Sequence, residues 1–417
     1  KWNVLNFVYS VHFAIRRILK HKRWNFGQST FKAKSYFCNM KKIIIKKVKT
    51  TEEMDNFIQF PKLLYADSPY FIPNLNMEEE IFFKTQESHG LEFLDTQAFI
   101  AFDQEGKILG RIAGIINHQV NKEQNKKNVN FCFFDFVDDI QVSAALLNAV
   151  INWGKEQGME YIQGPKGITD SDKGGMLIED FEQLGSINTS YNYPYYPQHM
   201  KELGYKKEVD WIQIHIDIPS KTPYSYAKVA HICKETFNLK AIKINNADIA
   251  HRGYSSKIFH FLKQTYFPLF GFTKFSDKQI DDLVKKYLGL IDMRLVSVVE
   301  NEKNEVIGIA ISMYSLSHAI QRSKGKLYPF GWYHLIKALK WRPENHVDLL
   351  FIAVRPDYQM LGVNAILFDD LISSYNQLGI LWAETAPLQE NSIQELDQWK
   401  LLNPTFTKRR RCYIKKI

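Results

Sequence analysis

One order of secondary-structure elements occurs twice along the chain, and this repetition constrains the fold more than any other feature of the sequence. The hydrophobic pattern of the first copy predicts a strand at 42–49, a helix that Thr51 caps, a hairpin at 97–103 and 108–117, an apolar strand at 130–136, a helix with apolar residues at helical spacing from Val142 to Trp153, and a strand at 160–163.

The second copy begins near residue 240 and follows the same order. Its pattern predicts a strand at 240–244, two helices within 254–289 that divide near Gly271, a hairpin at 294–300 and 305–313, a buried strand at 347–354, a helix at 359–378, a strand at 380–384, a helix near Asn391 and a last strand at 410–416. Since 417 residues are too many for one ordinary core, we expect an α/β protein with two domains, 40–220 and 221–417.

The net charge of +9 is concentrated at the N-terminus. Residues 1–39 contain eight Lys or Arg and no Asp or Glu, which leaves +1 for residues 40–417. The main part of the chain therefore offers no electrostatic reason to expect nucleic acid as a partner. Three interpretations of residues 1–39 are open. They could be upstream sequence that precedes a true start at Met40, a basic targeting segment, or an amphipathic arm at a membrane surface. In each case we expect them to lie outside the fold.

The four cysteines are far apart in the sequence, and no Cys or His spacing typical of a metal site occurs. We therefore expect a reduced, cytoplasmic protein without a metal.

The segment from Asp348 to Leu367 carries the clearest chemical signal. An apolar strand ends at Val354, and Pro356 prevents its continuation because proline lacks a backbone N–H. A turn then leads to a helix whose start contains Gly362. A strand, a turn and a helix N-terminus in this order leave backbone N–H groups unpaired, and these suit a phosphate or pyrophosphate.

This segment resembles the acetyl-CoA-binding motif of the GNAT (acyl-CoA N-acyltransferase) superfamily, a Val-x-Pro followed by Arg/Gln-x-x-Gly-x-Gly/Ala. Gln359, Gly362 and Asn364 occupy the three positions of the second part, and Asn364 departs from the small residue expected there. Residues 40–417 as a whole resemble bacterial proteins with tandem acetyltransferase-like halves, for example at 110–113, 164–166 and 362–365.

The resemblance implies two GNAT-like domains, each with a mixed, mostly antiparallel, splayed sheet flanked by helices. It also implies that acetyl-CoA or a longer acyl-CoA lies between two splayed strands as co-substrate. The residues expected to contact it are Ala353, Val354, Gln359, Met360, Leu361, Gly362, Val363, Asn364, Ala365 and Asn391. Asn391 is either a residue near coenzyme A, as in many GNAT enzymes, or an ordinary helix cap. In the first half, Asp138 and Asp139 stand where phosphates would bind, so we expect no pyrophosphate loop there.

Acyl transfer to an amine needs a base for the amine and an acid for the leaving thiolate. Glu384, at the end of the strand after the motif helix, is the expected base, and Asp348 on the neighbouring strand is the alternative. Tyr413 on the last strand is the candidate acid, because no tyrosine follows Asn391 where the superfamily usually has one. Three roles are open for the basic run 408–411. It could bind the 3′-phosphate of coenzyme A, bind an anionic acceptor, or face solvent.

Residues 314–346 form a long insert rich in aromatic residues between two predicted strands. Four roles are open for the insert. It could line a site for a long acyl chain, act as a lid, dock on a membrane surface, or pack between the two halves.

The expected function is N-acyl transfer from acyl-CoA to a small-molecule amine or a lipid-like acceptor. One alternative is a GNAT-fold protein that binds a CoA thioester or another ligand without transfer. A further variant is a lipid-forming N-acyltransferase that uses acyl carrier protein.

Overall fold

The computed structural model describes residues 42–76, 79–80, 93–167, 173–251, 253–265, 291–341, 343–392 and 396–417. The predicted extension 1–39 lies outside these residues, as does the predicted helix that follows Gly271. Within the described ranges, no helix is both long and apolar enough to cross a bilayer.

The first half contains the predicted strand, helix, hairpin, strand, helix and strand, followed by further elements. They are β1 (Ile44–Lys47), α2 (Thr51–Leu64), β2 (Leu94–Phe102), β3 (Ile108–Asn117), α4 (His118–Glu123), β4 (Asn128–Phe136), α5 (Ile140–Glu156), β5 (Tyr161–Gly164), β6 (Met176–Leu177), α6 (Tyr195–Glu202) and β7 (Lys206–Asp217).

The second half repeats this order and adds short helices in the aromatic insert. Its elements are α7 (Tyr224–Thr236), β8 (Lys240–Ile242), α8 (Asn246–His251), α9 (Tyr254–Thr265), β9 (Val296–Glu300), β10 (Val306–Tyr314), α11 (Ser317–Ser323), α12 (Gly331–Ile336), a π-helical turn (Lys337–Trp341), β11 (His346–Val354), a 3-10 turn (Pro356–Tyr358), α13 (Val363–Leu378), β12 (Trp382–Thr385), β13 (Leu388–Gln389) and β14 (Thr405–Lys416).

Two details of the prediction are wrong. The cap of α2 is Thr50 rather than Thr51, because the Thr50 side chain accepts from the Glu53 N–H while Glu53 accepts from the Thr50 N–H. Helix α13 begins at Val363 rather than at residue 359, because Pro356 starts a separate 3-10 turn and Met360 has a positive φ.

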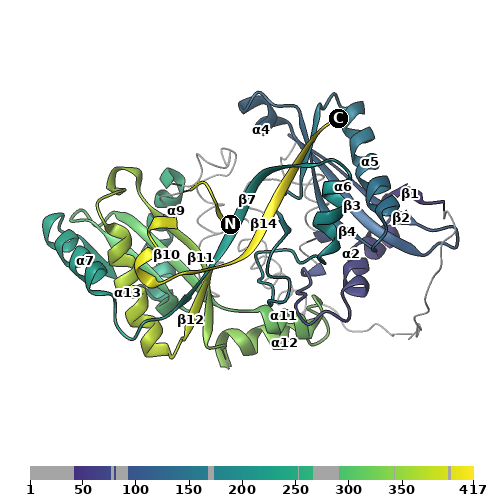
Figure 1. Cartoon of the computed structure of the whole chain (residues 1–417). Helices are drawn as coiled ribbons and strands as arrows, with labels where there is room; N and C mark the ends of the chain where they lie inside the picture. The colour runs from purple at the N-terminus through teal and green to yellow at the C-terminus, as the bar shows by residue number, and fades with distance from the viewer. Residues whose placement is uncertain are drawn as a thin grey trace.

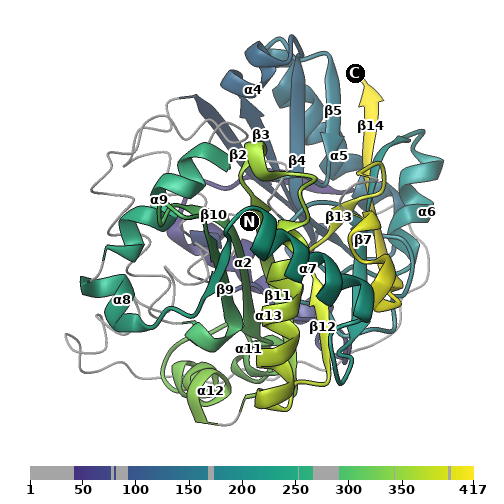
Figure 2. The same ribbon diagram turned by 90° about the vertical axis from the view of Figure 1, so that its left-hand side faces the viewer.

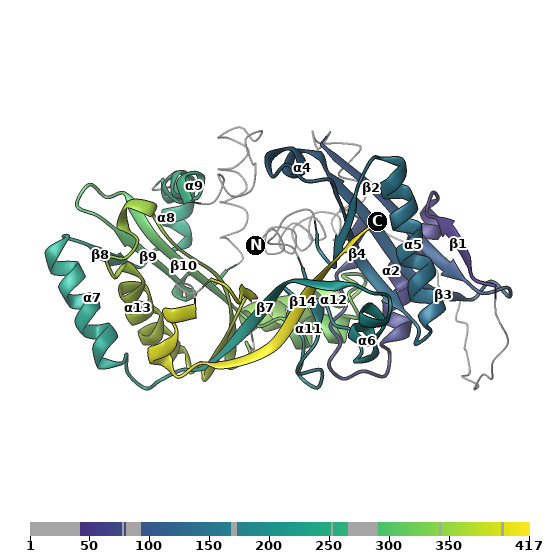
Figure 3. The ribbon, with the colours of Figure 1, turned by 45° about the horizontal axis from the view of Figure 1, so that its top comes forward.

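The strands of the described residues join in one mixed, mostly antiparallel sheet with the order β1-β2-β3-β4-β5-β14-β7-β12-β11-β10-β9-β8, which confirms the predicted fold class. Outside this order, β13 pairs with β7 and β6 pairs with β14. Only the pairs β4–β5 and β11–β12 are parallel among these neighbours. Two long strands at the centre connect the two lobes of the molecule (Figures 1 and 3).

The two central strands are exchanged between the halves. Strand β7 belongs to the first half by sequence, yet it pairs with β12 of the second half. Strand β14 belongs to the second half, yet it pairs with β5 of the first half as well as with β7. The division of the chain into 40–220 and 221–417 stays a prediction, and each of these units would receive one strand from the other.

Apolar side chains from both halves form the cores on the two faces of this sheet. Helix α5 covers the first half, where Val142, Leu146 and Val150 are fully buried. In the second half, α13 packs on one face of the sheet over β9 and β10, and α7 lies beside α13 (Figure 2). The opposite face is covered by α8 and α9 and by the insert with α11 and α12.

Candidate active site

Strands β11 and β12 lie side by side for four residues and then diverge. Their parallel pairing runs from His346 opposite Trp382 to Leu349 opposite Thr385. Beyond Leu349, β11 continues to Val354 with hydrogen bonds to β10 on its other edge. The chain after β12 instead turns to β13, which pairs with β7. A gap between splayed strands therefore opens beside the last residues of β11, and Ala353 and Val354 are half-buried on it.

The turn after β11 carries a backbone geometry that only a few residues adopt easily. Gly362 has φ +84° and forms the N-cap of α13, and no side chain caps this helix. Met360 has φ +63° and is 86% exposed. Since the first N–H groups of a helix have no partner within the helix, the N–H groups of Gly362, Val363 and Asn364 are available to a ligand, with no acceptor among the described residues.

Helix α7 holds this turn in place. The Cys233 thiol donates to the Leu361 carbonyl oxygen at 2.7 Å. A Cβ atom on Gly362 would lie 2.7 Å from Cγ1 of Val229 and 2.8 Å from Sγ of Cys233. Glycine is therefore required at this position both for the positive φ and for the close approach of α7.

The side chains of the predicted coenzyme A residues do not all point outward. Gln359 is exposed, and its Nε2 donates to the Val354 carbonyl oxygen at 3.2 Å. Val363 and Ala365 are buried in the core beneath α13, so these two residues can offer a ligand only their backbone. Asn391 is exposed in the turn after β13, and the next helical hydrogen bond, from the Leu396 N–H, goes to the Ser392 carbonyl oxygen.

The N-terminus of α5, the equivalent helix in the first half, is already occupied. The Asp139 carboxylate accepts from the Gln141 N–H at 2.8 Å and caps the helix. Asp138 lies 3.1 Å from Nε2 of His199. The two carboxylates at the start of α5 repel an anion. Helix α13 differs, because no carboxylate caps it.

A buried cluster of charged side chains lies where β11 and β12 begin to diverge. Asp348 and Glu384 are neighbours across the two strands, and both are nearly inaccessible to solvent. The Lys408 Nζ is 2.6 Å from Oε1 of Glu384. Burial raises the pKa of Asp348 to about 7, and the adjacent Glu384 carboxylate adds to the increase, while Lys408 opposes it. Asp348, next to the Lys408–Glu384 pair, therefore titrates near neutral pH.

Several polar atoms around this cluster are buried without a partner among the described residues. They are Oδ2 of Asp348, Oε1 of Gln213, Oγ1 of Thr407 and Nε of Arg410. Residues that pair directly across strands share a face of the sheet. Glu384 pairs with His215, and Gln213 pairs with Thr407, so these groups lie on the face opposite α13. Buried polar atoms are normally satisfied, so this face has unused capacity for a polar ligand or water.

The predicted base and the predicted acid are not brought together. Glu384 lies at the level of His215 and Thr405 in the sheet. Tyr413 lies five residues beyond Lys408, the partner of Glu384, which is a rise of roughly 17 Å along β14. It is buried in the core of the first half, and burial raises its pKa to about 12. The geometry therefore offers Tyr413 no access to the cluster around Glu384.

The basic run 408–411 is engaged in pairs inside the protein. Lys408 pairs with Glu384, and Arg411 pairs with Asp210 at 2.8 Å. Arg410 is 1% exposed and donates to the Ser190 carbonyl oxygen, and burial lowers its pKa to about 10. The sequence does not show that this run completes a polar cluster, because a run of four charges ordinarily marks a solvated surface.

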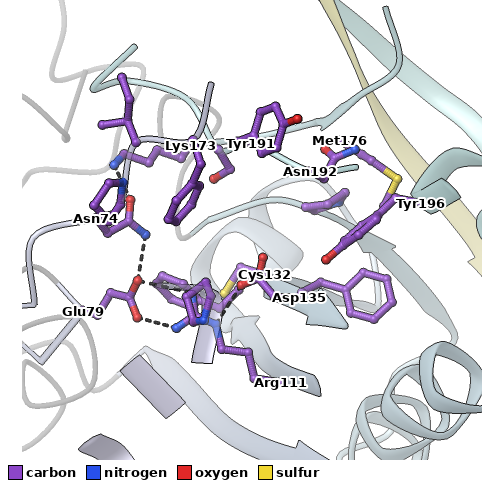
Figure 4. A pocket seen from close by; sticks show the side chains of 18 of the residues that line it. Asn74, Glu79, Arg111, Cys132, Asp135, Lys173, Met176, Tyr191, Asn192 and Tyr196 are labelled. Atoms are coloured by element: carbon purple, nitrogen blue, oxygen red, sulfur yellow. Dashed lines mark hydrogen bonds and ion pairs between the residues drawn. The ribbon is translucent and has the colours of Figure 1, made fainter. Parts of the chain in front are cut away.

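A second polar cluster lines a cavity of about 60 Å³ in the first half, beside the divergence of β4 and β5 (Figure 4). Arg111 lies 2.5 Å from Oε2 of Glu79 and 2.7 Å from Oδ2 of Asp135, and all three are buried. Asp135 also accepts from the Tyr65 hydroxyl at 3.0 Å. Burial lowers the pKa of Lys62, on the wall of the same cavity, to about 8. Arg111 pairs with both carboxylates and also donates to the Phe57 carbonyl oxygen of α2, so the first role of this group is to hold α2 against β3 and β4.

Metal ligation has no evident place in either cluster. Across the described ranges, no group of three or more His, Cys, Asp or Glu side chains is arranged to hold a metal ion.

Comparison with known proteins gives two similar sequences from bacteria. Protein YghO of Escherichia coli (strain K12) is 26% identical over 327 residues, which cover 76% of this chain and 79% of that protein. The bacterial ceramide synthase of Caulobacter vibrioides (strain NA1000 / CB15N) is 24% identical over 314 residues, which cover 75% of this chain and 80% of that protein. No protein-family model matches the chain.

Two solved structures share the architecture. A tandem GNAT protein from the clavulanic acid biosynthesis pathway aligns with a TM-score of 0.50 at 7% identity, over 90% of this chain and 98% of that one. The GCN5-related glucosamine N-acetyltransferase region of a fungal multi-domain GH3 beta-N-acetylglucosaminidase aligns with a TM-score of 0.52 at 13% identity. That alignment covers 90% of this chain, which spans 38% of the larger fungal chain. The chain therefore has the tandem fold of the GCN5-related N-acetyltransferase superfamily.

Proposed function

We propose that the protein is an N-acyltransferase that takes an acyl group from acyl-CoA and transfers it to the amine of a lipid-like acceptor. The observation that supports this most directly is the uncapped N-terminus of α13, with Gly362 at φ +84°, beside the gap between the splayed strands β11 and β12. The GNAT fold supports the class of reaction.

The chain's own groups fit a pyrophosphate at this turn. The N–H groups of Gly362, Val363 and Asn364 would hold the phosphate oxygens, and the positive end of the helix dipole favours their charge. The open edge of β11 at Ala353 and Val354 would accept the amide groups of the pantetheine arm as a short strand. Bound acyl-CoA supplies a thioester, whose carbonyl carbon an amine can attack.

Asp348 is the group best placed to take a proton from the amine. It lies at the point where β11 and β12 diverge, one carboxylate oxygen lacks a partner among the described residues, and its pKa of about 7 suits a general base at neutral pH. Glu384 pairs with Lys408, and the Glu384 carboxylate next to Asp348 helps to raise the pKa of Asp348. In this proposal Glu384 positions and tunes the base, and Asp348 accepts the proton.

The similarity to a bacterial ceramide synthase supports a lipid-like amine as acceptor. The chain length of the acyl group and its carrier can be tested directly. We expect acyl-CoA to serve as donor, and a preference for acyl carrier protein would favour the variant in which the acyl group arrives on a protein.

The test changes one charge at equivalent positions of two helices. Asn364 is the second residue of α13, and Gln141 is the second residue of α5. Asn364→Glu should keep or slightly raise the thermal stability, because a carboxylate suits a helix N-terminus. It should weaken CoA binding by at least ~10-fold, because the new charge faces the pyrophosphate. Gln141→Glu is the matched control and should bind CoA as the unchanged protein does.

Calorimetric titration with CoA and a thiol-release assay with acyl-CoA and long-chain amines provide the measurements. Equal CoA affinity in both variants would remove the proposed site. CoA binding without thiol release for any amine would favour a GNAT-fold protein that binds its ligand without transfer.

A further inference from the structure

We propose that the insert between β10 and β11 docks on an anionic lipid bilayer. The docking surface consists of the exposed aromatic residues Tyr328, Phe330, Tyr333 and Trp341 and the exposed lysines Lys324, Lys326 and Lys340; we call it the aromatic surface. This inference goes beyond the proposed function and does not depend on it.

The insert has apolar side chains on both of its faces. Leu335, Ala338 and Leu339 are buried against α11 and fix the helical segment to the protein. On the other side, Phe330 is 72% exposed and Trp341 is 60% exposed. A helical segment that packs by one face ordinarily presents polar side chains on the other. The exposed aromatic side chains therefore indicate a second apolar environment.

Two of these aromatic side chains are in contact with each other, and one of them also contacts the neighbouring Trp332. The rings of Tyr333 and Trp341 are 5.8 Å apart, and the ring of Trp332 lies 6.3 Å from that of Tyr333. The Trp332 indole N–H donates to the Pro329 carbonyl oxygen at 2.9 Å, which fixes the turn before α12. A cluster of this kind forms a preformed apolar contact area.

The charges of the insert are mainly positive. Residues 314–346 contain six Lys or Arg and one acidic residue, Glu344; outside the insert, Asp292 lies near Lys340. Trp and Tyr prefer the interface between a bilayer and water, and lysines beside them attract anionic headgroups. A symmetric contact with a second copy of the chain would bring the same lysines together, and their repulsion disfavours it. The charge complementarity therefore favours an anionic membrane.

The position of the insert suits a bilayer. Figures 1 and 2 both show α11 and α12 at the lower edge of the molecule. The insert joins the start of β11, close to Asp348, whereas Gly362 follows the other end of β11. The nine residues of this strand span roughly 26 Å. A bilayer at the insert would therefore leave the turn at Gly362 in water.

The experiment measures binding of the full chain to vesicles by cosedimentation. The vesicles contain phosphatidylcholine alone or phosphatidylcholine mixed with phosphatidylglycerol. We expect binding to the mixed vesicles. The double variant Phe330→Ser, Trp341→Ser should bind at least ~30-fold more weakly, because two apolar side chains no longer enter the interface. The control is Tyr224→Ser on α7, which removes an aromatic side chain that is 78% exposed elsewhere and should leave binding unchanged.

The charge contribution is tested by Lys324→Gln with Lys326→Gln. Binding to mixed vesicles should fall roughly 30-fold, since each lysine near an anionic surface contributes about a factor of five. The basic residues 1–39 are present in every variant, so differences between variants report on the aromatic surface.

Unchanged vesicle binding in both double variants would overturn the proposal. A chain that ignores vesicles but forms a dimer that Phe330→Ser dissociates would also overturn it, and would assign the surface to a second copy. CoA affinity is measured separately, so failure here leaves the proposed function standing.

Discussion

Asp348→Asn is the substitution that most sharply tests the buried polar cluster. Asparagine has the shape of aspartic acid, so the packing between β11 and β12 is kept. It cannot ionise, so it removes the charge that burial and Glu384 disfavour. The predicted consequence is a change in how stability depends on pH.

The magnitude follows from the pKa of Asp348, which rises from its ordinary value of 3.8 to about 7 in the folded protein. A tenfold change in proton affinity corresponds to ~1.4 kcal/mol, so the ionised group costs about 4 kcal/mol relative to one in solvent. Because the folded pKa is the higher one, the favourable contribution of the protonated form is present below pH 3.8 and is lost as pH rises through 7.

The assay is chemical unfolding of both proteins at a series of pH values between 4 and 8, a window set by the two pKa values. The free energy of unfolding of the Asp348→Asn variant, minus that of the unchanged protein, should increase with pH by up to ~4 kcal/mol. Asp67→Asn, at an exposed aspartate, is the control and should show no such trend. The Asp348 variant should also lose acyl transfer while it retains CoA binding.

A difference that stays constant with pH would refute the assignment of a near-neutral pKa to Asp348. Full transfer activity in a folded Asp348→Asn variant would refute its role as the base, and Glu384 would become the candidate again.

Two further predictions concern stability alone. Arg111→Ala should lower the free energy of unfolding by ~3–5 kcal/mol, because it leaves two buried carboxylates without their partner. Urea unfolding measures this loss. A loss below ~1 kcal/mol would show that water replaces the guanidinium. Thr50→Ala should cost ~1 kcal/mol through the loss of the capping box with Glu53, whereas Thr51→Ala should cost much less; thermal unfolding of both variants compares them, and equal losses would contradict Thr50 as the cap.

The order of elements and the turn at Gly362 could be predicted from local patterns. The strand that ends at Val354, the proline after it and Gly362 are read from adjacent residues, and the fold places them as expected. The start of α13 differs from the prediction, because methionine does not by itself favour the positive φ that Met360 adopts in this turn. A helix pattern shows which residues are apolar, and it does not show where the first helical turn is interrupted.

The partners of Glu384 could not be predicted, because they come from segments distant in the sequence. Lys408 reaches Glu384 only because β14 crosses to the neighbourhood of β12. In the sequence, Lys408 stands beside three arginines and looks like part of a solvated run. Tyr413 is a candidate acid only because no tyrosine follows Asn391, and its distance from Glu384 becomes apparent only from the register of β14 with β5 and β7.

The exchange of β7 and β14 has a consequence for how the chain folds during synthesis. Strand β5 is the inner edge of the first half, and its neighbour β14 follows every other described strand in the chain. The first half emerges from the ribosome early but must wait, with an open sheet edge, until β14 has been made. We therefore expect the nascent chain to need protection of that edge until a late stage, and the two lobes to unfold together as one cooperative unit rather than in sequence.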